Sequence, residues 1–265
     1  MTIIWEKTIY SVFPNGETES TARATQYTAA RTVVNTVGSR PERQVHRRSP
    51  AQWATEEINK AALTGEIQKR DELFIYPTSH DISPEHLGVH LQHIRRILDA
   101  GNRLLICSKM HYDCVVAICD ANSDKVAQLN LRCTIGSRDS SILHWWEPGA
   151  PDYGERKSAV EYAFNHGFDT SLSCEPMLDS NIDAVVEDMR SIVSESIWIG
   201  KMNNVRQNLT LNGVTGPVAE AKASVLLAWQ NDDSNIMRLV KKYADDPLIR
   251  WKESIKRVID RNTNE

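Results

Sequence analysis

Long apolar runs are absent from this 265-residue sequence, and no segment is apolar for long enough to cross a bilayer. The opening residues, MTIIWEKTIY, carry charge and contain no extended apolar stretch of the kind a secretion signal needs. The formal net charge is only −4, so we expect no general attraction to nucleic acid or to a membrane surface. Together these absences predict a cytoplasmic globular protein without a membrane partner.

Cysteine is scarce, and its spacing is poor for metal binding. The chain has five cysteines, an odd number, and no C-x2-C pair among them. We therefore expect reduced and mostly buried thiols in place of disulfides or a metal site made from them. The five are Cys107, Cys114, Cys119, Cys133 and Cys174.

Two common nucleotide-binding motifs are also missing. No G-x-G-x-x-G follows the first predicted strand, and no G-x4-G-K-[ST] occurs anywhere. A Rossmann dinucleotide site and a P-loop are therefore unsupported.

What the sequence does contain is a regular alternation of short β-rich runs with amphipathic helical stretches. One helix is predicted over 83–101 because Pro84 is suited to its first turn and Gly101 to the position after its end. Strands are predicted around Tyr10–Phe13 and over 71–79, 102–109, 130–137, 169–176 and 195–202, with further helices over 112–128, 153–166 and 181–193. After Pro217 the chain is predicted to be helical, with a break near Asp246-Pro247.

Alternation of this kind predicts an α/β protein with a parallel sheet and right-handed crossovers. Six units fit either a doubly wound sheet or an open, partial barrel, and periodicity does not separate the two. No linker is evident, so a single structural unit is the simplest interpretation.

Polar residues recur where the predicted strands end, which is where parallel α/β folds place their sites. Lys109, Glu175 and Lys201 are predicted to surround a common mouth. Lys109 has a structural alternative, because it could pair with a carboxylate at the rim. His80, at the end of the strand predicted over 71–79, also has one, because it could serve with its neighbour Asp81 to cap the next helix. Glu175 directly before a proline is the strongest functional candidate, because a carboxylate at a buried rim needs a partner or a ligand.

These strand-end residues belong to longer stretches that resemble radical SAM proteins related to spore photoproduct lyase, often labelled DNA-repair photolyase-like. The resemblance covers Thr21 to about Asn203. It is carried by FIYPTSHDISPEHL (74–87), AGNRLLICSKMHYDCVVAIC (100–119), LRCTIGSRDSSILHWWEPGAP (131–151), AFNHGFDTSLSCEPMLD (163–179) and SIWIGKMN (196–203). It implies a partial (βα)6 TIM-type barrel over residues 1–216, with a helical extension over 217–265 packed on it.

One motif departs from this family. Where the family has C-x3-C-x-Y-C-Y-A-R, the chain has TARATQYTAAR, with Thr21, Thr25 and Thr28 at the cysteine positions. Tyr27 matches the family, and Ala30 and Arg31 match too, whereas Ala29 replaces a tyrosine. A [4Fe–4S] cluster is held by soft thiolates, and neutral, hard threonine hydroxyls cannot replace them. The chain is therefore expected to lack the cluster and the radical chemistry that depends on it.

The resemblance further implies S-adenosylmethionine or a nucleotide-like small molecule at the barrel mouth. The implied ligand-binding residues are Tyr27, Ser108, Lys109, Thr134, Ser173 and Glu175. No catalytic residue is assigned, but Lys109, Glu175 and His80 are candidates. One alternative is that this chain is a cluster-removed form of an active enzyme that cleaves S-adenosylmethionine to a 5′-deoxyadenosyl radical.

Two further alternatives come from the residues themselves. Lys109 could form a Schiff base with a carbonyl substrate, with Glu175 or His80 as its acid–base partner. A basic run in a predicted loop could instead make the protein a nucleic-acid-binding or regulatory module. That run contains Arg40, Arg43, Arg47 and Arg48.

Overall fold

The computed structural model describes residues 64–77 and 80–263. The predicted early strand at Tyr10–Phe13, the threonine motif with Tyr27, and the four arginines of the basic run lie outside the described residues. Within them, six strands form one sheet in which every neighbouring pair is parallel and the order follows the chain, β1-β2-β3-β4-β5-β6. The strands are β1 (Phe74–Tyr76), β2 (Leu104–Ser108), β3 (Leu129–Thr134), β4 (Asp169–Cys174), β5 (Ser196–Ile199) and β6 (Ile249–Trp251).

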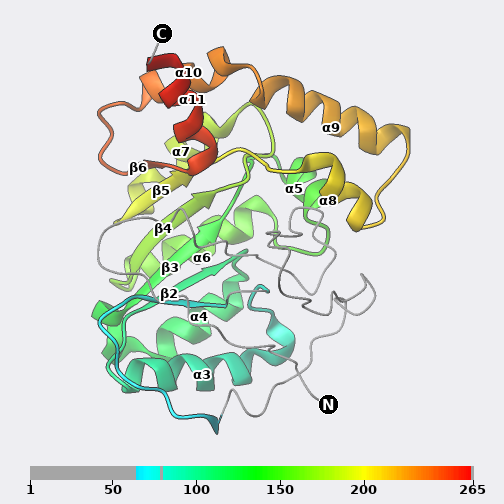
Figure 1. The fold of residues 1–265 in the computed structure, drawn as a ribbon. Coiled ribbons are helices and arrows are strands. Elements are labelled where there is room, and N and C mark those ends of the chain that lie inside the picture. The colour runs from blue at the N-terminus through cyan, green and yellow to red at the C-terminus, as the bar shows by residue number, and fades with distance from the viewer. Residues whose placement is uncertain (1–63, 78–79, 264–265) are drawn as a thin grey trace.

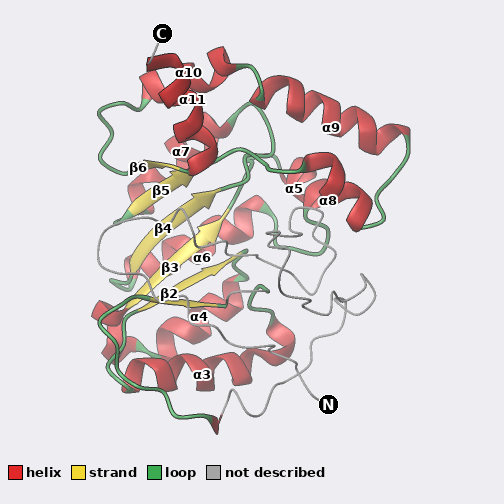
Figure 2. Ribbon diagram, viewed as in Figure 1, coloured by secondary structure: helices red, strands yellow, loops and turns green. Residues whose placement is uncertain are grey.

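Helices occupy the connections between the strands (Figures 1 and 2), which confirms the predicted α/β class. The α-helices are α3 (Leu87–Asp99), α4 (Tyr112–Ala121), α5 (Ser140–Trp146), α6 (Tyr153–Asn165), α7 (Ile182–Met189), α8 (Val205–Leu211), α9 (Pro217–Gln230), α10 (Asp233–Lys242) and α11 (Glu253–Thr263). Short 3-10 turns cover Pro84–His86, Ser123–Gln128 and Arg190–Ile192. None of the helices in the described part of the chain is long and apolar enough to span a membrane.

The predicted ends of two helices agree with the structure, and the start of α6 has a cap that the sequence analysis did not identify. Gly101 and Gly167 follow α3 and α6 with φ angles of 82° and 81°, a left-handed conformation that favours glycine. Asp152 caps the start of α6, where its side chain accepts a hydrogen bond from the Glu155 backbone N–H at 2.8 Å.

The prediction that only helices follow Pro217 was wrong at β6. Ile249–Trp251 is a parallel edge strand against β5, and the Ile197 and Lys252 backbone N–H groups donate to Leu248 and Ile199 at 2.8 and 2.9 Å. The strand has only three residues and follows shortly after Pro247, so it is too short for a period-two alternation to be recognised in the sequence. Its position depends on these tertiary hydrogen bonds to β5 and on the burial of Ile249.

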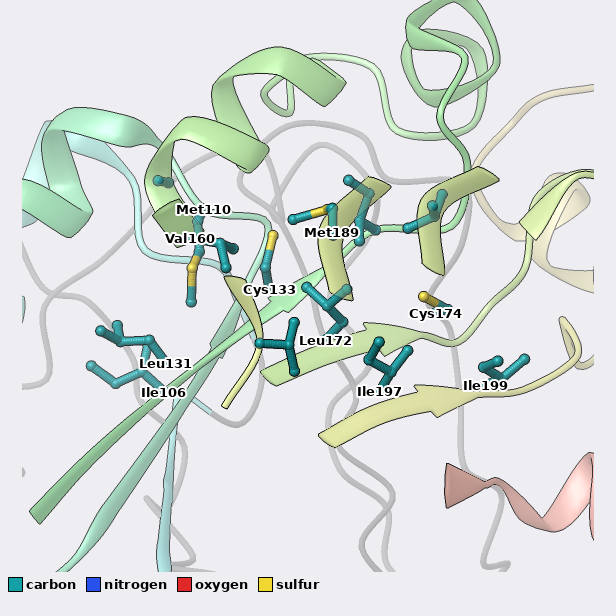
Figure 3. Close-up of a cluster of buried hydrophobic side chains, with 14 of the residues drawn as sticks. Ile106, Met110, Leu131, Cys133, Val160, Leu172, Cys174, Met189, Ile197 and Ile199 are labelled. Atoms are coloured by element: carbon teal, nitrogen blue, oxygen red, sulfur yellow. The ribbon is translucent and has the colours of Figure 1, made fainter. Parts of the chain in front are cut away.

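One face of the sheet forms the hydrophobic core. Alternate strand residues such as Leu131, Leu172 and Ile197 are fully buried and pack against side chains from the helices, among them Val160 of α6 and Met189 of α7 (Figure 3). All five cysteines are buried and free, as predicted. The C-terminal helices belong to the same core, because Ile236, Leu239, Ile255 and Val258 are almost completely inaccessible to solvent.

Candidate functional site

The opposite face of the sheet is lined by polar side chains over its central strands. Period-two alternation puts these residues opposite the core positions of the same strands. We call this surface the polar face and define it by Asn130, Arg132, Thr134, Ser171, Ser173, Ser196 and Trp198. The core cluster contains none of them, although it contains their strand neighbours Leu131, Cys133, Leu172, Cys174, Ile197 and Ile199. Ligand sites commonly place a few such polar groups beside an apolar or aromatic side chain, and Trp198 is the aromatic side chain here.

Small residues on β4 let a large aromatic side chain reach across the polar face. Ser171 and Ser173 separate Arg132 on β3 from Trp198 on β5 in the strand register. The Arg132 Cζ nevertheless lies 5.5 Å from the centre of the Trp198 ring, within cation–π range. Two further contacts fix the Arg132 side chain: its Nε donates to Ser171 Oγ at 3.0 Å, and its Nη2 lies 3.4 Å from Glu195 Oε2.

A second cation approaches the same ring from the edge of the sheet. The Lys252 Nζ, just after β6, lies 4.8 Å from the centre of the Trp198 ring and 3.4 Å from Glu175 Oε2. Glu175 follows β4 and crosses over Gly200, where an added Cβ would lie 2.9 Å from Glu175 Cγ and 2.9 Å from Lys252 Cβ. Gly200 is therefore the residue that lets Glu175 reach this position.

The predicted mouth residues have different partners. Lys109 is buried, and its Nζ lies 3.1 Å from Asp81 Oδ2, which bears out the alternative of a carboxylate partner for this lysine. Asp81 also accepts hydrogen bonds from the Lys109 backbone N–H at 2.8 Å and from Ser108 Oγ at 3.2 Å. Ser108 in turn accepts from the Ile82 backbone N–H at 3.0 Å. These contacts fasten the loop after β1 to the end of β2, and they give Ser108 and Lys109 a structural role.

Lys201 lies elsewhere at the rim. Its backbone N–H donates to Ser254 Oγ at 2.9 Å, and burial lowers the pKa of its side chain. The Lys109 Nζ is buried and in contact with Asp81 Oδ2 at 3.1 Å, so the geometry does not favour attack by this lysine on a carbonyl substrate.

Thr134 and Ser173 lie side by side on the polar face, and Ser173 is next to Trp198 in the register. The Thr134 hydroxyl lies 3.8 Å from Cys107 Sγ. Burial raises the pKa of the Cys107 thiol, while the positive charges of Arg132 and Lys252 act in the opposite direction. The structure thus brings Thr134, Ser173 and Glu175 of the predicted ligand set toward one surface and ties Ser108 and Lys109 to Asp81.

His80 belongs to an aromatic cluster around Tyr76. Its ring stacks on His90 at a centroid distance of 5.5 Å, and the Tyr76 hydroxyl lies 2.7 Å from His90 Nδ1. The Tyr76 and His93 ring centroids are 5.1 Å apart. Burial lowers the pKa of His80 to about 3 and, with a smaller effect of Arg96, that of His93 to about 4. Neutral imidazoles packed in this way indicate a structural role for His80.

A buried ion pair, Arg156 with Glu147, fastens α6 to the loop after α5. The Arg156 Nη1 lies 2.7 Å from Glu147 Oε2, and both side chains are inaccessible to solvent. Arg156 also donates to the Thr134 and Pro151 carbonyls at 3.0 and 2.8 Å. Through the Thr134 carbonyl, Arg156 therefore holds the end of β3 against α6. Trp146 is buried and makes an edge-to-face contact with Trp145 at 4.5 Å, which agrees with a packing role for this pair.

The side chains that the structure describes do not form a site for an iron–sulfur cluster. Over residues 64–77 and 80–263, no three His, Cys, Asp or Glu side chains are placed to hold a metal ion. Burial raises the pKa of Cys119 and Cys133 to about 12 and raises that of Cys174 further, which disfavours the thiolate that iron requires. Residues 21–28, where the resemblance places the cluster motif, lie outside the described residues and contain threonines but no cysteine.

Comparisons with protein-family models, curated proteins and solved structures found no match for this chain. Sequence reasoning missed Arg132, Trp198 and Lys252. Arg132 and Trp198 share the period-two face with Ser171 and Ser173, which is a signal that could have identified them. Lys252 had no such signal, because it depends on the unpredicted strand β6.

Proposed function

We propose that this protein is a partial (βα)6 barrel of the radical SAM kind that binds a nucleoside-like small molecule, such as S-adenosylmethionine, on its polar face and performs no radical chemistry. The observation that supports this most directly is the arrangement of Trp198 between Arg132 and Lys252, next to the hydroxyls of Ser173 and Thr134. An aromatic surface, hydroxyl groups and charges of both signs suit a base, a ribose and a zwitterionic tail.

An inward-curving sheet is supported by side chains that converge over its polar face. Arg132 on β3 and Lys252 after β6 come from opposite sides of β5, and both lie near the Trp198 ring, at 5.5 and 4.8 Å from its centre. Sequential strand order, parallel pairing and a core on one face also suit a barrel that is left open.

The absence of radical chemistry rests on ligand chemistry. Three neutral hydroxyls replace the three thiolates, and the described cysteines are buried. Without the cluster, the ligand must be held by protein contacts alone. We therefore expect weaker binding than a cluster-anchored site provides.

Equilibrium dialysis with S-adenosylmethionine and with 5′-methylthioadenosine tests the proposal. We expect saturable binding of at least one compound. Binding of S-adenosylmethionine should be weakened about tenfold or more by Glu175→Gln, because this change removes the carboxylate that can pair with the amino group of its zwitterionic tail. Glu155→Gln is the matched control and should leave binding unchanged, because Glu155 lies in the first turn of α6 and pairs with His111 at 3.1 Å, not with a residue of the polar face. Absence of binding of both compounds at millimolar concentration would refute the proposal.

A further inference from the structure

One hydrogen-bond donor on the polar face lacks a partner. The Trp198 indole Nε1 is buried, and no acceptor among the residues that the structure describes lies within hydrogen-bond distance. A buried indole N–H normally has a partner, because losing hydration without a replacement bond is costly. The missing acceptor is therefore expected to come from a bound molecule.

The charges around this indole define what kind of acceptor fits. Arg132 and Lys252 lie 5.5 and 4.8 Å from the ring, and both act on the pKa of Cys107 in the direction expected for positive charge. A negatively charged oxygen would receive charge-assisted hydrogen bonds here, which are stronger than neutral ones.

The cations also have carboxylate partners, and these can be exchanged. The ion pairs Arg132–Glu195 and Lys252–Glu175 are both 3.4 Å long, and the glutamate side chains are 44% and 31% exposed. The cations are largely buried, at 8% and 18% exposed, but the carboxylates remain in contact with water and the pairs are long, so each ion pair contributes little stability. An incoming anion can therefore take over part of the interaction at low cost.

We propose that Arg132, Lys252 and Trp198 Nε1 form an anion subsite that binds a carboxylate or phosphate group of the ligand. This inference rests on the proposed function, because it assigns one part of the same site. The hydroxyls of Ser173 and Thr134 then contact the uncharged part of the ligand.

Indole N–H resonances of protein labelled with ¹⁵N-tryptophan test this directly. The Trp198 resonance is assigned by its loss in Trp198→Phe, and the fold of that variant is checked by its circular dichroism and Tm. Titration with inorganic phosphate and with acetate should move the Trp198 resonance downfield and saturate, while the other tryptophan resonances stay in place. Phosphate and acetate titrations separate the two anion classes. A Trp198 resonance that moves with neither anion would overturn the inference.

Charge-neutral variants provide the second readout. Arg132→Gln and Lys252→Gln should each weaken the phosphate- or acetate-dependent shift about tenfold or more. Arg206→Gln is the control, because Arg206 pairs with Glu220 on the exposed surface of α8 and α9. Equal weakening in the control variant would show that only net charge matters, and would also overturn the inference.

Failure of the subsite and failure of the proposed function give different results. Binding of 5′-methylthioadenosine, which carries no anionic group, without any anion effect on Trp198 would leave the proposed function intact and reject the subsite. An anion-dependent shift of Trp198 without binding of either nucleoside would support the subsite and reject the nucleoside-like ligand.

Discussion

At the residue scale, a few positions determine the geometry of the polar face. Gly200 provides the space through which Glu175 crosses, and the serines of β4 provide the space that Trp198 occupies. The small residues at these positions thus determine where the larger side chains of Glu175 and Trp198 lie. The site is therefore more sensitive to added volume at these small residues than to the loss of a single hydroxyl.

Gly200→Ala should destabilise the protein by about 1–3 kcal/mol, because the new Cβ would lie 2.9 Å from both Glu175 and Lys252. The free energy of unfolding, measured by urea titration, checks this. Gly88→Ala is the matched control: no atom lies within 4 Å of the added Cβ, and the helix gains up to about 1 kcal/mol. Equal stability in the two variants would contradict the crowding at Gly200.

Acid should destabilise the fold through the histidine cluster. The pKa of His93 is about 4 in the folded protein and about 6.5 when unfolded, so the unfolded chain binds more protons between these values. Stability is therefore complete above pH 6.5 and falls by roughly 1 kcal/mol per pH unit for this histidine as the pH drops toward 4.

Urea unfolding at pH 7, 6, 5 and 4.5 measures this slope. His93→Gln should reduce the slope, whereas substitution of the exposed His144 on α5 by Gln should not. An unchanged slope in His93→Gln would show that other groups control the acid response.

At the element scale, the C-terminal segment completes the sheet and its core. Strand β6 pairs with β5, and α11 follows it directly. The reciprocal hydrogen bonds between Gln230 and the Met202 backbone, at 3.0 and 2.9 Å, join α9 to the end of β5. Removing this segment would expose a strand edge and apolar surface together.

Ile255→Ala in α11 should reduce the free energy of unfolding by about 2–5 kcal/mol, because this side chain is fully buried. Val225→Ala in α9 is the control: that side chain is 73% exposed, and its loss should change stability by less than about 0.5 kcal/mol. Thermal unfolding of both variants measures the difference. A small effect of Ile255→Ala would mean that α11 is not part of the folding unit.

At the scale of the whole molecule, the hydrophobic core and the threonine motif are separate features. The sheet and helices of the described residues share one apolar core, which includes strand residues such as Leu131 and Leu172. Under the proposed function, Thr21, Thr25 and Thr28 lack the thiolates that radical chemistry requires.

Iron and acid-labile sulfide should be near zero after anaerobic reconstitution, with no charge-transfer absorption in the visible spectrum. The combined variant Thr21→Cys, Thr25→Cys and Thr28→Cys should bind about four irons per chain if the motif marks a former cluster loop. Thr64→Cys, Thr170→Cys and Thr210→Cys together form a control with equal thiol content. About four irons in the unmodified protein would contradict the interpretation of the threonine motif.

The sequence by itself determined the α/β alternation, the approximate positions of the strands and of every α-helix except α5 between residues 71 and 202, the glycine stops and the burial of the cysteines. These are local consequences of periodicity, turn chemistry and hydrophobicity. Only the tertiary structure decided that Ile249–Trp251 forms a strand, that Lys109 pairs with Asp81, and that Trp198 lies between Arg132 and Lys252. Each of these depends on residues distant in the chain, whose partners are fixed by sheet register and side-chain volume and leave no local pattern to detect.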